Sequence, residues 1–392
     1  MANRFAITGL TLLSGLVLSP SVFAQNNPNN NSTAAITTAV PFLRISPDAR
    51  SGAMGDVGIA LSPDANAQYW NVGKIAASKK DAGLSVTYTP WLKDIAPDVF
   101  LAYLAGYKKF GEGDNQALSA SLRYFNLGDI NYTDINAMPA GDGKPREFAV
   151  DLGYSRNLSE YLSMGIALRY INSNIAAGAP ESAGSYRAGN AFGADIGLYY
   201  HKAKVMTEER QGTFSAGATL SNVGSKITYS QERKDFLPIN LGIGAAYEYQ
   251  VDQFNKITGE LDLNKTLVPA PKFITDDQGN SYWESPTQGV VSGMLNSFGN
   301  APKGYGTTIS VGGEYWYQDQ FALRAGYFYE NANNGDRQYF TCGLGIRYNV
   351  FGLDFSYLIP SGSGTTRNPL SNTLRFTLSF DFDQLNFNNQ KS

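Results

Sequence analysis

Apolar and polar residues alternate along most of the chain after residue 80, and this period of two is typical of β-strands with one apolar and one wet face. The alternation predicts fourteen strands, with twelve as the alternative count because Asp98–Phe110 alternates poorly and Asn255–Leu263 is short. The predicted strands are Ala82–Thr89, Asp98–Phe110, Gln116–Leu127, Glu147–Arg156, Tyr161–Ile171, Ala191–His201, Thr213–Ser221, Ile239–Gln250, Asn255–Leu263, Thr307–Tyr317, Gln320–Tyr329, Gln338–Tyr348, Phe351–Ile359 and Asn372–Phe382.

Two segments show the faces most clearly. Their apolar faces carry Leu162, Met164, Ile166, Leu168 and Tyr170 in one strand, and Phe340, Cys342, Leu344, Ile346 and Tyr348 in the other. The alternate positions are small or charged, namely Ser163, Gly165, Ala167, Arg169, Thr341, Gly343, Gly345 and Arg347. Apolar residues that face lipid and small or charged residues that fill a wet interior are expected of a transmembrane barrel.

Short and long connections alternate between the predicted strands. The long set includes Gly128–Arg146, Asn172–Asn190, Asn222–Pro238 and Asn264–Gly306, whereas the short set includes residues 157–160, 251–253, 318–319 and 349–350. Tight periplasmic turns and longer external loops are typical of outer-membrane barrels, and neither a β-sandwich nor a propeller predicts this alternation. The chain is therefore expected to be all-β, an antiparallel transmembrane β-barrel of about 14 strands with both termini on the periplasmic side.

Composition agrees with this fold class and excludes others. The chain holds 24 Tyr, 22 Phe and 41 Gly, with only 17% charged residues and a mean hydropathy of −0.25. A net charge of −3 without a basic stripe argues against nucleic acid as a partner. The single cysteine, Cys342, excludes an internal disulfide.

The first residues predict export. Arg4 precedes an apolar stretch that is too short to span a bilayer, and Val22 and Ala24 are the small residues that signal peptidase requires. We therefore expect a signal peptide at 1–24, a disordered Asn-rich linker at 25–40, a plug or hatch at 41–80, the barrel at 81–383 and a periplasmic tail at 384–392.

The segment before the first strand is expected to close the periplasmic mouth of the barrel, which would otherwise hold a channel. Pro47–Asp48 predicts the start of a helical turn, Asp56–Leu61 a strand, and Asp64–Ala77 a helix. Tyr69, Trp70 and Asn71 are the plug candidates.

Several motifs then suggest a family. Asp48–Arg50, Gly55–Asp56 and Tyr69–Asn71 resemble the hatch of FadL-like outer-membrane barrels, although Val72–Gly73 replaces their usual Pro–Ala after the Asn. Closer similarity is to the PorV family of the type IX secretion system, through Gly313–Tyr317, Phe321–Tyr327, Asn349–Pro360, Asn368–Leu370 and Thr373–Phe376. The last strand also resembles the aromatic-rich terminal signal that assembly machinery reads in outer-membrane proteins.

The resemblance implies a non-enzymatic component of the cell outer membrane that receives cargo proteins through their C-terminal signal domain at the translocon and delivers them to the surface attachment complex. The implied partners are the type IX translocon barrel, cargo C-terminal domains, attachment-complex proteins and lipopolysaccharide in the bilayer. Cargo contacts are expected on the loops Gly128–Arg146, Asn172–Asn190 and Asn264–Gly306.

Two alternative functions are open at this point, a FadL-like transporter of small hydrophobic molecules and a lipopolysaccharide deacylase. A hydrolase of this kind needs a His-activated nucleophile, and His201 is the only histidine. We interpret it as structural, and we interpret Cys342 as an outward-facing residue. No cofactor or metal site is expected, since Asp276–Asn280 lacks the spacing of a calcium loop.

Two further residue sets are candidates for functional roles. The charged residues expected in the lumen, where they would pair with one another, are Arg123, Arg169, Glu260, Glu314 and Arg324. Ser285–Pro286 predicts the start of an amphipathic helix in the longest loop, and Gly299 predicts its end. Its apolar face, covered by the barrel rim or by another protein, would consist of Val290, Val291, Met294, Leu295 and Phe298.

Overall fold

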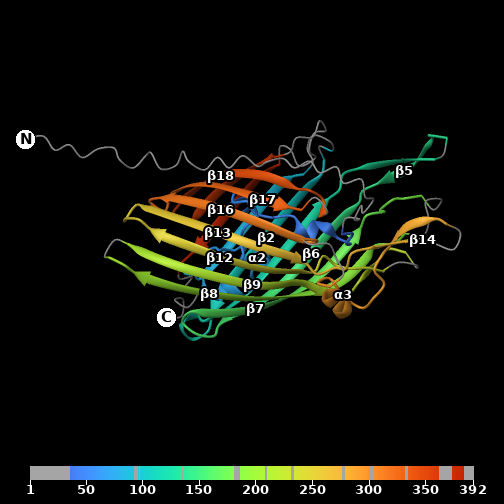
Figure 1. Cartoon of the computed structure of the whole chain (residues 1–392). Coiled ribbons are helices and arrows are strands. Elements are labelled where there is room, and N and C mark those ends of the chain that lie inside the picture. The colour runs from blue at the N-terminus through green and yellow to red at the C-terminus, as the bar shows by residue number, and fades with distance from the viewer. Residues whose placement is uncertain are drawn as a thin grey trace, which may run out of the picture. The chain divides into compact units, whose positions relative to one another are not determined.

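Fourteen antiparallel strands close into a single barrel in this computed structural model (Figure 1). The structure describes residues 36–91, 96, 98–134, 136–180, 186–207, 210–230, 234–275, 279–299, 304–331, 334–361 and 373–383. The expected signal peptide, the tail at 384–392, the resemblance motif Asn368–Leu370 and most of the linker lie outside these residues, as does Asp276–Gln278.

The observed strands confirm the predicted count of fourteen and the predicted positions. In order around the barrel they are β1 Ala82–Pro90, β2 Phe100–Phe110, β3 Gln116–Asn126, β6 Arg146–Asn157, β7 Leu162–Asn174, β8 Gly189–Val205, β9 Gln211–Gly224, β12 Asn240–Gln250, β13 Asn255–Thr266, β16 Thr307–Tyr317, β17 Phe321–Glu330, β18 Gln338–Tyr348, β19 Phe351–Pro360 and β20 Leu374–Phe382. The first strand pairs with the last, Ala82 opposite Phe382, which closes the sheet.

Alternation along each strand sets which side chains enter the lumen. In β7 the predicted apolar face is outward, with Leu168 66% exposed, whereas Arg169 on the other face is buried. The same holds in β18, where Cys342 is exposed on the outer face. Because a one-residue slip would exchange the two faces, the pattern also determines the register of the strands.

Aromatic residues form belts on the outer surface at both ends of the strands. One belt includes the contacting rings of Tyr88, Phe100 and Tyr124, and it continues through Phe148, Tyr170 and Phe192. At the opposite end of the strands lie the ring pairs Phe110–Tyr154, Tyr161–Tyr200 and Phe351–Phe380. Two aromatic belts flanking an apolar band place the barrel wall across a bilayer.

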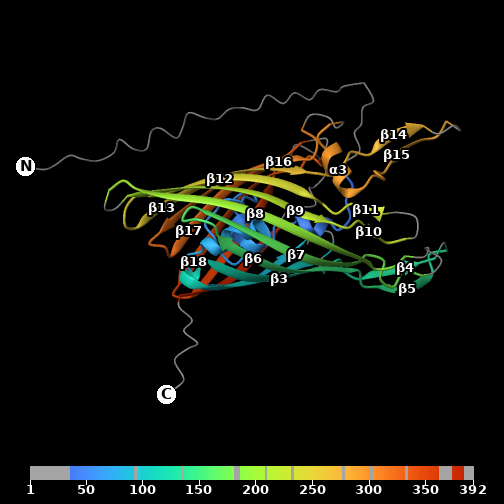
Figure 2. The ribbon, with the colours of Figure 1, turned by 90° about the horizontal axis from the view of Figure 1, so that it is seen from below.

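The predicted alternation of short and long connections is confirmed. We call the two ends of the barrel the short-turn end and the long-loop end. Three of the long connections contain hairpins that the sequence pattern did not predict, β4 Ile130–Thr133 with β5 Pro139–Gly143, β10 Ile227–Thr228 with β11 Lys234–Asp235, and β14 Lys272–Thr275 with β15 Ser281–Glu284. These hairpins extend beyond the barrel at the long-loop end (Figure 2).

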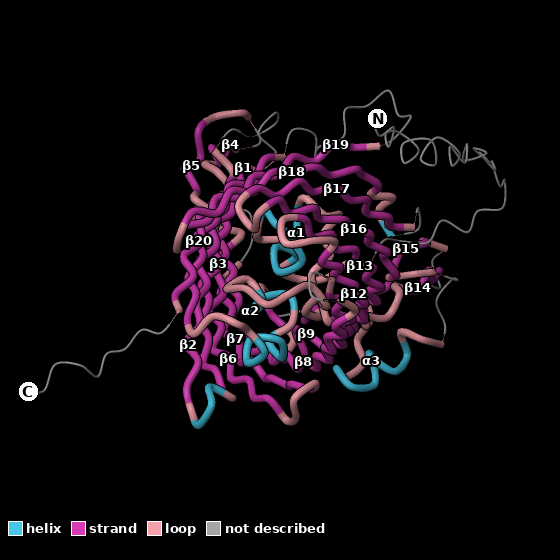
Figure 3. The backbone as a smooth tube through the Cα atoms, turned by 90° about the vertical axis from the view of Figure 1, so that its left-hand side faces the viewer, coloured by secondary structure: helices cyan, strands magenta, loops and turns pink. Residues whose placement is uncertain are grey.

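The segment before β1 lies inside the ring of strands (Figure 3). It contains the 3₁₀ helix η1 Pro41–Arg44, the short helices α1 Ala49–Gly52 and α2 Ala67–Trp70, and the 3₁₀ helix η2 Val72–Ala77; a further 3₁₀ turn, η3 Glu112–Asp114, lies between β2 and β3. Asp48 caps α1 by accepting a hydrogen bond from the Ser51 N–H, as the sequence predicted. Within the described residues, no helix is both long enough and apolar enough to cross a bilayer.

Two predictions for this segment were wrong. Asp56–Leu61 is not a strand, because the N–H groups of Gly58, Ile59 and Ala60 donate to carboxylates of β13 instead of to a neighbouring strand. The helix predicted for Asp64–Ala77 is interrupted at Asn71, whose backbone is extended and whose side chain bonds to other segments.

The loop helix is also shorter than predicted. The helix α3 is Val290–Asn296 with Gly289 as its N-cap, so Ser285–Pro286 is not its start. The carbonyls of Pro286 and Thr287 instead accept hydrogen bonds from Lys226 Nζ. Its buried side is centred on Gly293 and Ser297 rather than on the predicted apolar stripe.

Candidate functional site

The plug, Ile36–Lys80, passes through the lumen from one end of the barrel to the other. At the long-loop end, Ala39 N–H donates to the Phe236 carbonyl, and Phe42 and Leu43 join a core formed with Leu237 and Val268. At the short-turn end, Ser78 Oγ lies 2.7 Å from Tyr107 Oη. The plug therefore lies inside the barrel and extends from the periplasmic mouth, which it was expected to close, to the long-loop end.

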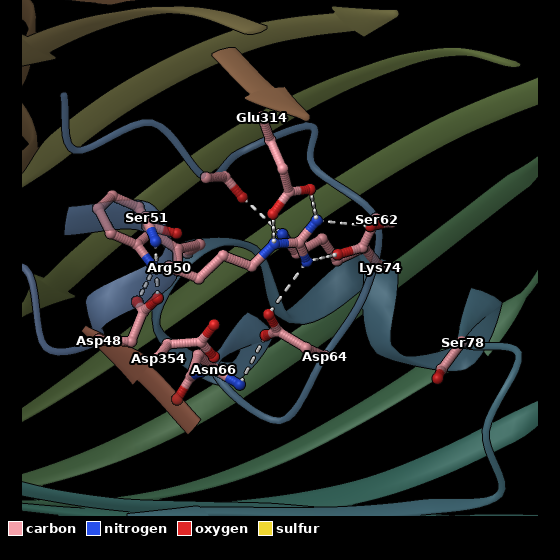
Figure 4. Close-up of polar contacts among 12 residues, drawn as sticks. Asp48, Arg50, Ser51, Ser62, Asp64, Asn66, Lys74, Ser78, Glu314 and Asp354 are labelled. Atoms are coloured by element: carbon pink, nitrogen blue, oxygen red, sulfur yellow. Dashed lines mark hydrogen bonds and ion pairs between the residues drawn. The ribbon is translucent and has the colours of Figure 1, made fainter. Parts of the chain in front are cut away.

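A buried ion cluster joins the plug to one side of the wall (Figure 4). Arg50 of α1 donates from Nε and Nη2 to the two oxygens of Glu314 on β16, at 3.1 and 2.9 Å. Arg324 of β17 donates to the same carboxylate at 2.7 Å and to Asp354 of β19 at 2.7 Å. We call Arg50, Glu314, Arg324 and Asp354 the Glu314 cluster. Removing one partner of such a cluster would leave a buried charge without compensation.

On β13, the strand that pairs with β16, two carboxylates hold the plug backbone. Asp262 accepts the N–H groups of Gly58 and Ile59 at 2.8 and 3.1 Å, and Glu260 accepts that of Ala60 at 2.6 Å. Lys74 is buried nearby and donates from Nζ to the Gly58 carbonyl at 2.6 Å. Burial lowers the pKa of Lys74, which the carboxylates around it oppose. These contacts satisfy backbone groups that have no secondary-structure partner.

Asp48 connects the two short helices of the plug. Its Oδ2 accepts from Ser51 N–H at 2.9 Å and its Oδ1 from Trp70 Nε1 at 2.6 Å (Figure 4). Burial, followed by repulsion from Asp64, raises the pKa of Asp48 to about 6. Both oxygens act as acceptors, so an amide could replace only one of the two bonds.

The three plug candidates lie in the lumen and contact the wall or the rest of the plug. Asn71 donates to the carbonyls of Ile59 and Leu198 at 3.0 and 2.9 Å. The Tyr69 ring lies 4.4 Å from the guanidinium carbon of Arg123. Trp70 bonds to Asp48 and packs against Gly58, where a Cβ would collide with the indole.

All five candidate lumen charges face inward and are buried, but most contact the plug or other acids rather than one another. Arg324 and Glu314 pair directly. Arg169 pairs with Asp151 and Asp195, whose position in β8 lies at a bulge opposite β9. The remaining two candidates bind the plug backbone: Arg123 donates to the Leu43 carbonyl, and Glu260 accepts from Ala60.

The sequence placed Arg50 and Asp56 in hatch-like motifs but indicated no partner for either, and it did not single out Lys74. A signal was present, because charged residues alternate with small and apolar ones in a segment that must enter a lumen. Asp262 was also detectable, since it lies two positions from Glu260 on one face of the same strand.

A cavity of about 80 Å³, which we call the lumen cavity, lies between the plug and the wall. Most of its lining is polar or charged, including Arg44, Asp56, Arg169, Asp195 and Arg375. By comparison, an apolar cavity of about 150 Å³ binds benzene. The size and polarity of the lumen cavity therefore do not favour a small hydrocarbon as its occupant.

The long-loop end presents a second kind of surface. Val291, Leu295 and Phe298, spaced four and three residues apart on and just after α3, are 70%, 68% and 61% exposed. Phe273 and Trp283, which are cross-strand partners in the β14–β15 hairpin of the same loop, and Tyr282 on the other face of that hairpin are exposed as well. We call these six residues of one loop the external apolar patch. Of the predicted partner-contact residues, Val290 and Met294 instead pack against the barrel core.

The residues considered for catalysis are dispersed. His201 lies near the short-turn end of β8, where its ring stacks on Tyr199 at 5.5 Å. In the part of the chain that the structure describes, its Nδ1 has no hydrogen-bond partner, so no carboxylate orients it there. The same residues contain no group of three potential metal ligands.

Solved structures with a similar backbone fold include bacterial transporters. The toluene transporter TodX of Pseudomonas putida matches with 13% identity over 85% of this chain and 97% of its own, at a TM-score of 0.46. The toluene transporter TbuX of Ralstonia pickettii shows 10% identity over 86% of this chain and 98% of its own, at a TM-score of 0.46. A Pseudomonas aeruginosa FadL homologue shows 11% identity over 90% of this chain and 99% of its own, at a TM-score of 0.41. At these TM-scores the likeness carries no argument about function.

The sequence itself provides the decisive comparison. No curated protein matches the chain. The family model described as "Type IX secretion system protein PorV" matches residues 27–273, which is more than half of the chain. The chain therefore belongs to the PorV family of type IX secretion system proteins.

Proposed function

We propose that this protein is a non-enzymatic shuttle in the outer membrane. In this proposal it receives cargo proteins at the translocon barrel through their C-terminal signal domains and delivers them to the surface attachment complex. The short turns face the periplasm, and the long loops face the cell exterior.

The external apolar patch carries this proposal. A loop in water rarely exposes several large apolar side chains unless another protein or a membrane covers them. Three of its members lie on one stripe along α3 and the turn that follows it, and the other three belong to a hairpin in the same loop. A helix stripe with this spacing suits a contact with an apolar groove or strand of a partner.

The plug that fills the lumen also supports the proposed shuttle function. Cargo has no route through a barrel whose lumen contains the plug, held by the Glu314 cluster and by Glu260 and Asp262. Contacts with large partners must therefore be made on the loops and the outer wall. The polar 80 Å³ cavity and the isolated His201 favour neither the transporter nor the deacylase alternative.

The test is affinity purification from the native membrane in mild detergent. A variant carrying Val291→Ser, Leu295→Ser and Phe298→Ser is compared with wild type. The matched control carries Leu158→Ser, Val205→Ser and Met206→Ser, which removes three exposed apolar side chains at the short-turn end.

Wild type and the control variant are expected to copurify with a very large outer-membrane protein and with secreted proteins that share a C-terminal domain. The α3 variant should lose one or both classes of partner while the barrel remains folded. Equal recovery from all three would overturn the assignment of the patch. Recovery of a lone barrel with a fatty acid in its lumen, from cells whose secretion survives deletion of the gene, would favour the transporter.

A further inference from the structure

Phe236, in the connection that follows β11, contacts both the plug and the loop helix α3. Its carbonyl accepts a hydrogen bond from the Ala39 N–H of the plug at 3.0 Å. Its ring lies against Gly293 of α3, where an added Cβ would be 2.8 Å from two ring carbons. Phe236 is buried, with 3% of its surface exposed. One residue therefore joins a segment inside the barrel to the helix of the external apolar patch.

Lys226 fixes the position of the Phe236 ring. Its Nζ lies 3.9 Å from the centroid of that ring, and a cation over an aromatic face is attracted by the ring. The same Nζ donates to the carbonyls of Pro286 and Thr287, in the loop that carries α3. The connection containing Phe236 and the loop containing α3 are therefore held together by a second contact, which does not depend on Gly293.

A single apolar core buries the outer end of the plug and the inner side of α3. Phe42 and Leu43 of η1 belong to this core together with Phe236, and Val290 and Met294 of α3 pack against it. Packed cores change between discrete arrangements rather than deforming gradually. A displacement of α3 must therefore be accommodated by the Phe236 ring or by the side chains of η1.

Val40, which follows Ala39, gives this part of the plug a strained backbone. It is 1% exposed and adopts φ 49° and ψ 51°, a left-handed conformation that is strongly disfavoured for a β-branched residue. Such a conformation persists only where surrounding contacts enforce it, and strained residues are concentrated in segments that switch. Here the shared core and the bond between Ala39 and Phe236 enforce it. We call residues 36–44 the outer plug segment; its release would relieve the strain.

We propose that the position of α3 and the seating of the outer plug segment are coupled through Phe236, so that a partner protein covering the external apolar patch tightens the plug. This inference rests on the proposed function, because it concerns regulation by the same partner surface. A partner that holds α3 against Phe236 favours the seated segment over the released one. By thermodynamic linkage, the seated segment favours the partner to the same extent.

Hydrogen exchange of the plug amides in the detergent-solubilised protein tests the coupling. Gly293→Val pushes against the Phe236 ring, and Ser292→Val is the matched control because Ser292 is exposed on the same helix. The amides of residues 58–60, which are bonded to carboxylates of β13, provide an internal reference. Phe236→Leu, alone and combined with Gly293→Val, completes a double-mutant cycle, since leucine keeps the backbone carbonyl but removes the ring.

Gly293→Val is expected to raise the exchange rate of the outer plug segment by about tenfold or more, with the reference amides unchanged and Ser292→Val like wild type. The same substitution should have a much smaller effect in the Phe236→Leu background. Unchanged exchange in Gly293→Val, an equal increase along the whole plug, or the same effect in both backgrounds would overturn the coupling. If Gly293→Val does not fold, Lys226→Met, which frees the ring without adding volume at α3, must produce the rise, and its absence refutes the proposal.

The complex copurified from the native membrane separates this inference from the proposed function. Exchange of the outer plug segment should be slower in the complex than in the free barrel by about fivefold or more. An intact complex with unchanged exchange would overturn the inference and leave the proposed function standing. Partner recovery that does not depend on α3 would refute the proposed function and the partner's role, while the comparison of Gly293→Val with Ser292→Val would still decide whether α3 and the plug are coupled.

Discussion

The lumen and the external apolar patch differ in which side chains they bury: the lumen buries charged groups, whereas the patch exposes apolar ones. In the lumen, charged groups such as Glu314 and Asp262 are buried, and each is bonded to the plug or to a neighbouring strand. On the patch, apolar groups such as Leu295 and Phe298 are exposed. A membrane barrel fills a wet interior with polar groups, so its buried charges belong to the internal structure, whereas the exposed apolar residues of the long loop form the surface that we propose for partner contacts.

The same difference suggests that substitutions in the lumen affect stability, whereas substitutions in the patch affect binding. Buried charge clusters contribute little net energy but are costly to break, because the remaining partner is left unpaired. Exposed apolar side chains contribute little to folding but much to association once covered. Substitutions in the lumen should therefore loosen the plug, and substitutions in the patch should leave the fold unchanged.

The largest effect is expected from Glu314→Gln. The amide cannot neutralise Arg50 and Arg324, so two buried guanidinium groups lose their shared counter-charge at a cost of about 3–5 kcal/mol. Hydrogen exchange of the plug amides should rise strongly and chemical unfolding should occur at lower denaturant. Glu284→Gln on the exposed β15 is the matched control and should behave like wild type. Unchanged plug protection in Glu314→Gln would show that the cluster does not hold the plug.

Gly55→Ala should be the next most severe change. Gly55 has φ +73°, and a Cβ there would lie 2.6 Å from the Tyr327 backbone nitrogen. The left-handed backbone costs about 1–2 kcal/mol for alanine, and the displaced backbone about 1–3 kcal/mol more. Gly289→Ala in the external loop, where nothing lies within 4 Å of the added Cβ, provides the comparison in the same unfolding assay. Similar midpoints for both variants would contradict the close fit of plug and wall.

Asp48 should make plug docking dependent on pH. Its pKa in the folded protein, about 6, lies above the ordinary value of 3.8, so the native state retains its proton to higher pH. The resulting stabilisation is fully present below pH 3.8 and is lost as the pH rises through about 6, a change on the order of 3 kcal/mol. Plug protection measured between pH 4 and 7.5 should fall with rising pH in wild type. In Asp48→Asn this slope should flatten, and an unchanged slope would assign the dependence to other groups.

The smallest effect on stability is expected from the α3 variant that removes Val291, Leu295 and Phe298. These side chains are already exposed, so the free energy of unfolding should change by less than about 0.5 kcal/mol for each substitution. Gly293→Val is the contrasting change in the same helix, since its Cβ would meet the Phe236 ring at 2.8 Å and displace α3. Proteolysis of the loop should distinguish the two. Destabilisation by the first variant would mean that the patch is part of the fold rather than a contact surface.

The sequence by itself determined the barrel. Strand positions, the outward and inward faces and the alternation of turns and loops all follow from a period of two, which is local information carried by neighbouring residues such as Leu168 and Arg169. Each strand can satisfy its backbone only by pairing with its neighbours in a closed sheet, so local pattern and global fold agree.

Only the tertiary structure decided the path of the plug, the charge pairs and the exposed face of α3. Arg50 meets Glu314 across 264 positions of sequence, and no local pattern encodes such a pair. Asp56–Leu61 reads as a strand but bonds to carboxylates instead, because the lumen provides side-chain acceptors and no free strand edge. In α3 the buried side follows Gly293, where the small residue permits close approach to Phe236, rather than the apolar stripe. Each of these outcomes depends on groups distant in sequence competing for the same polar atom or space.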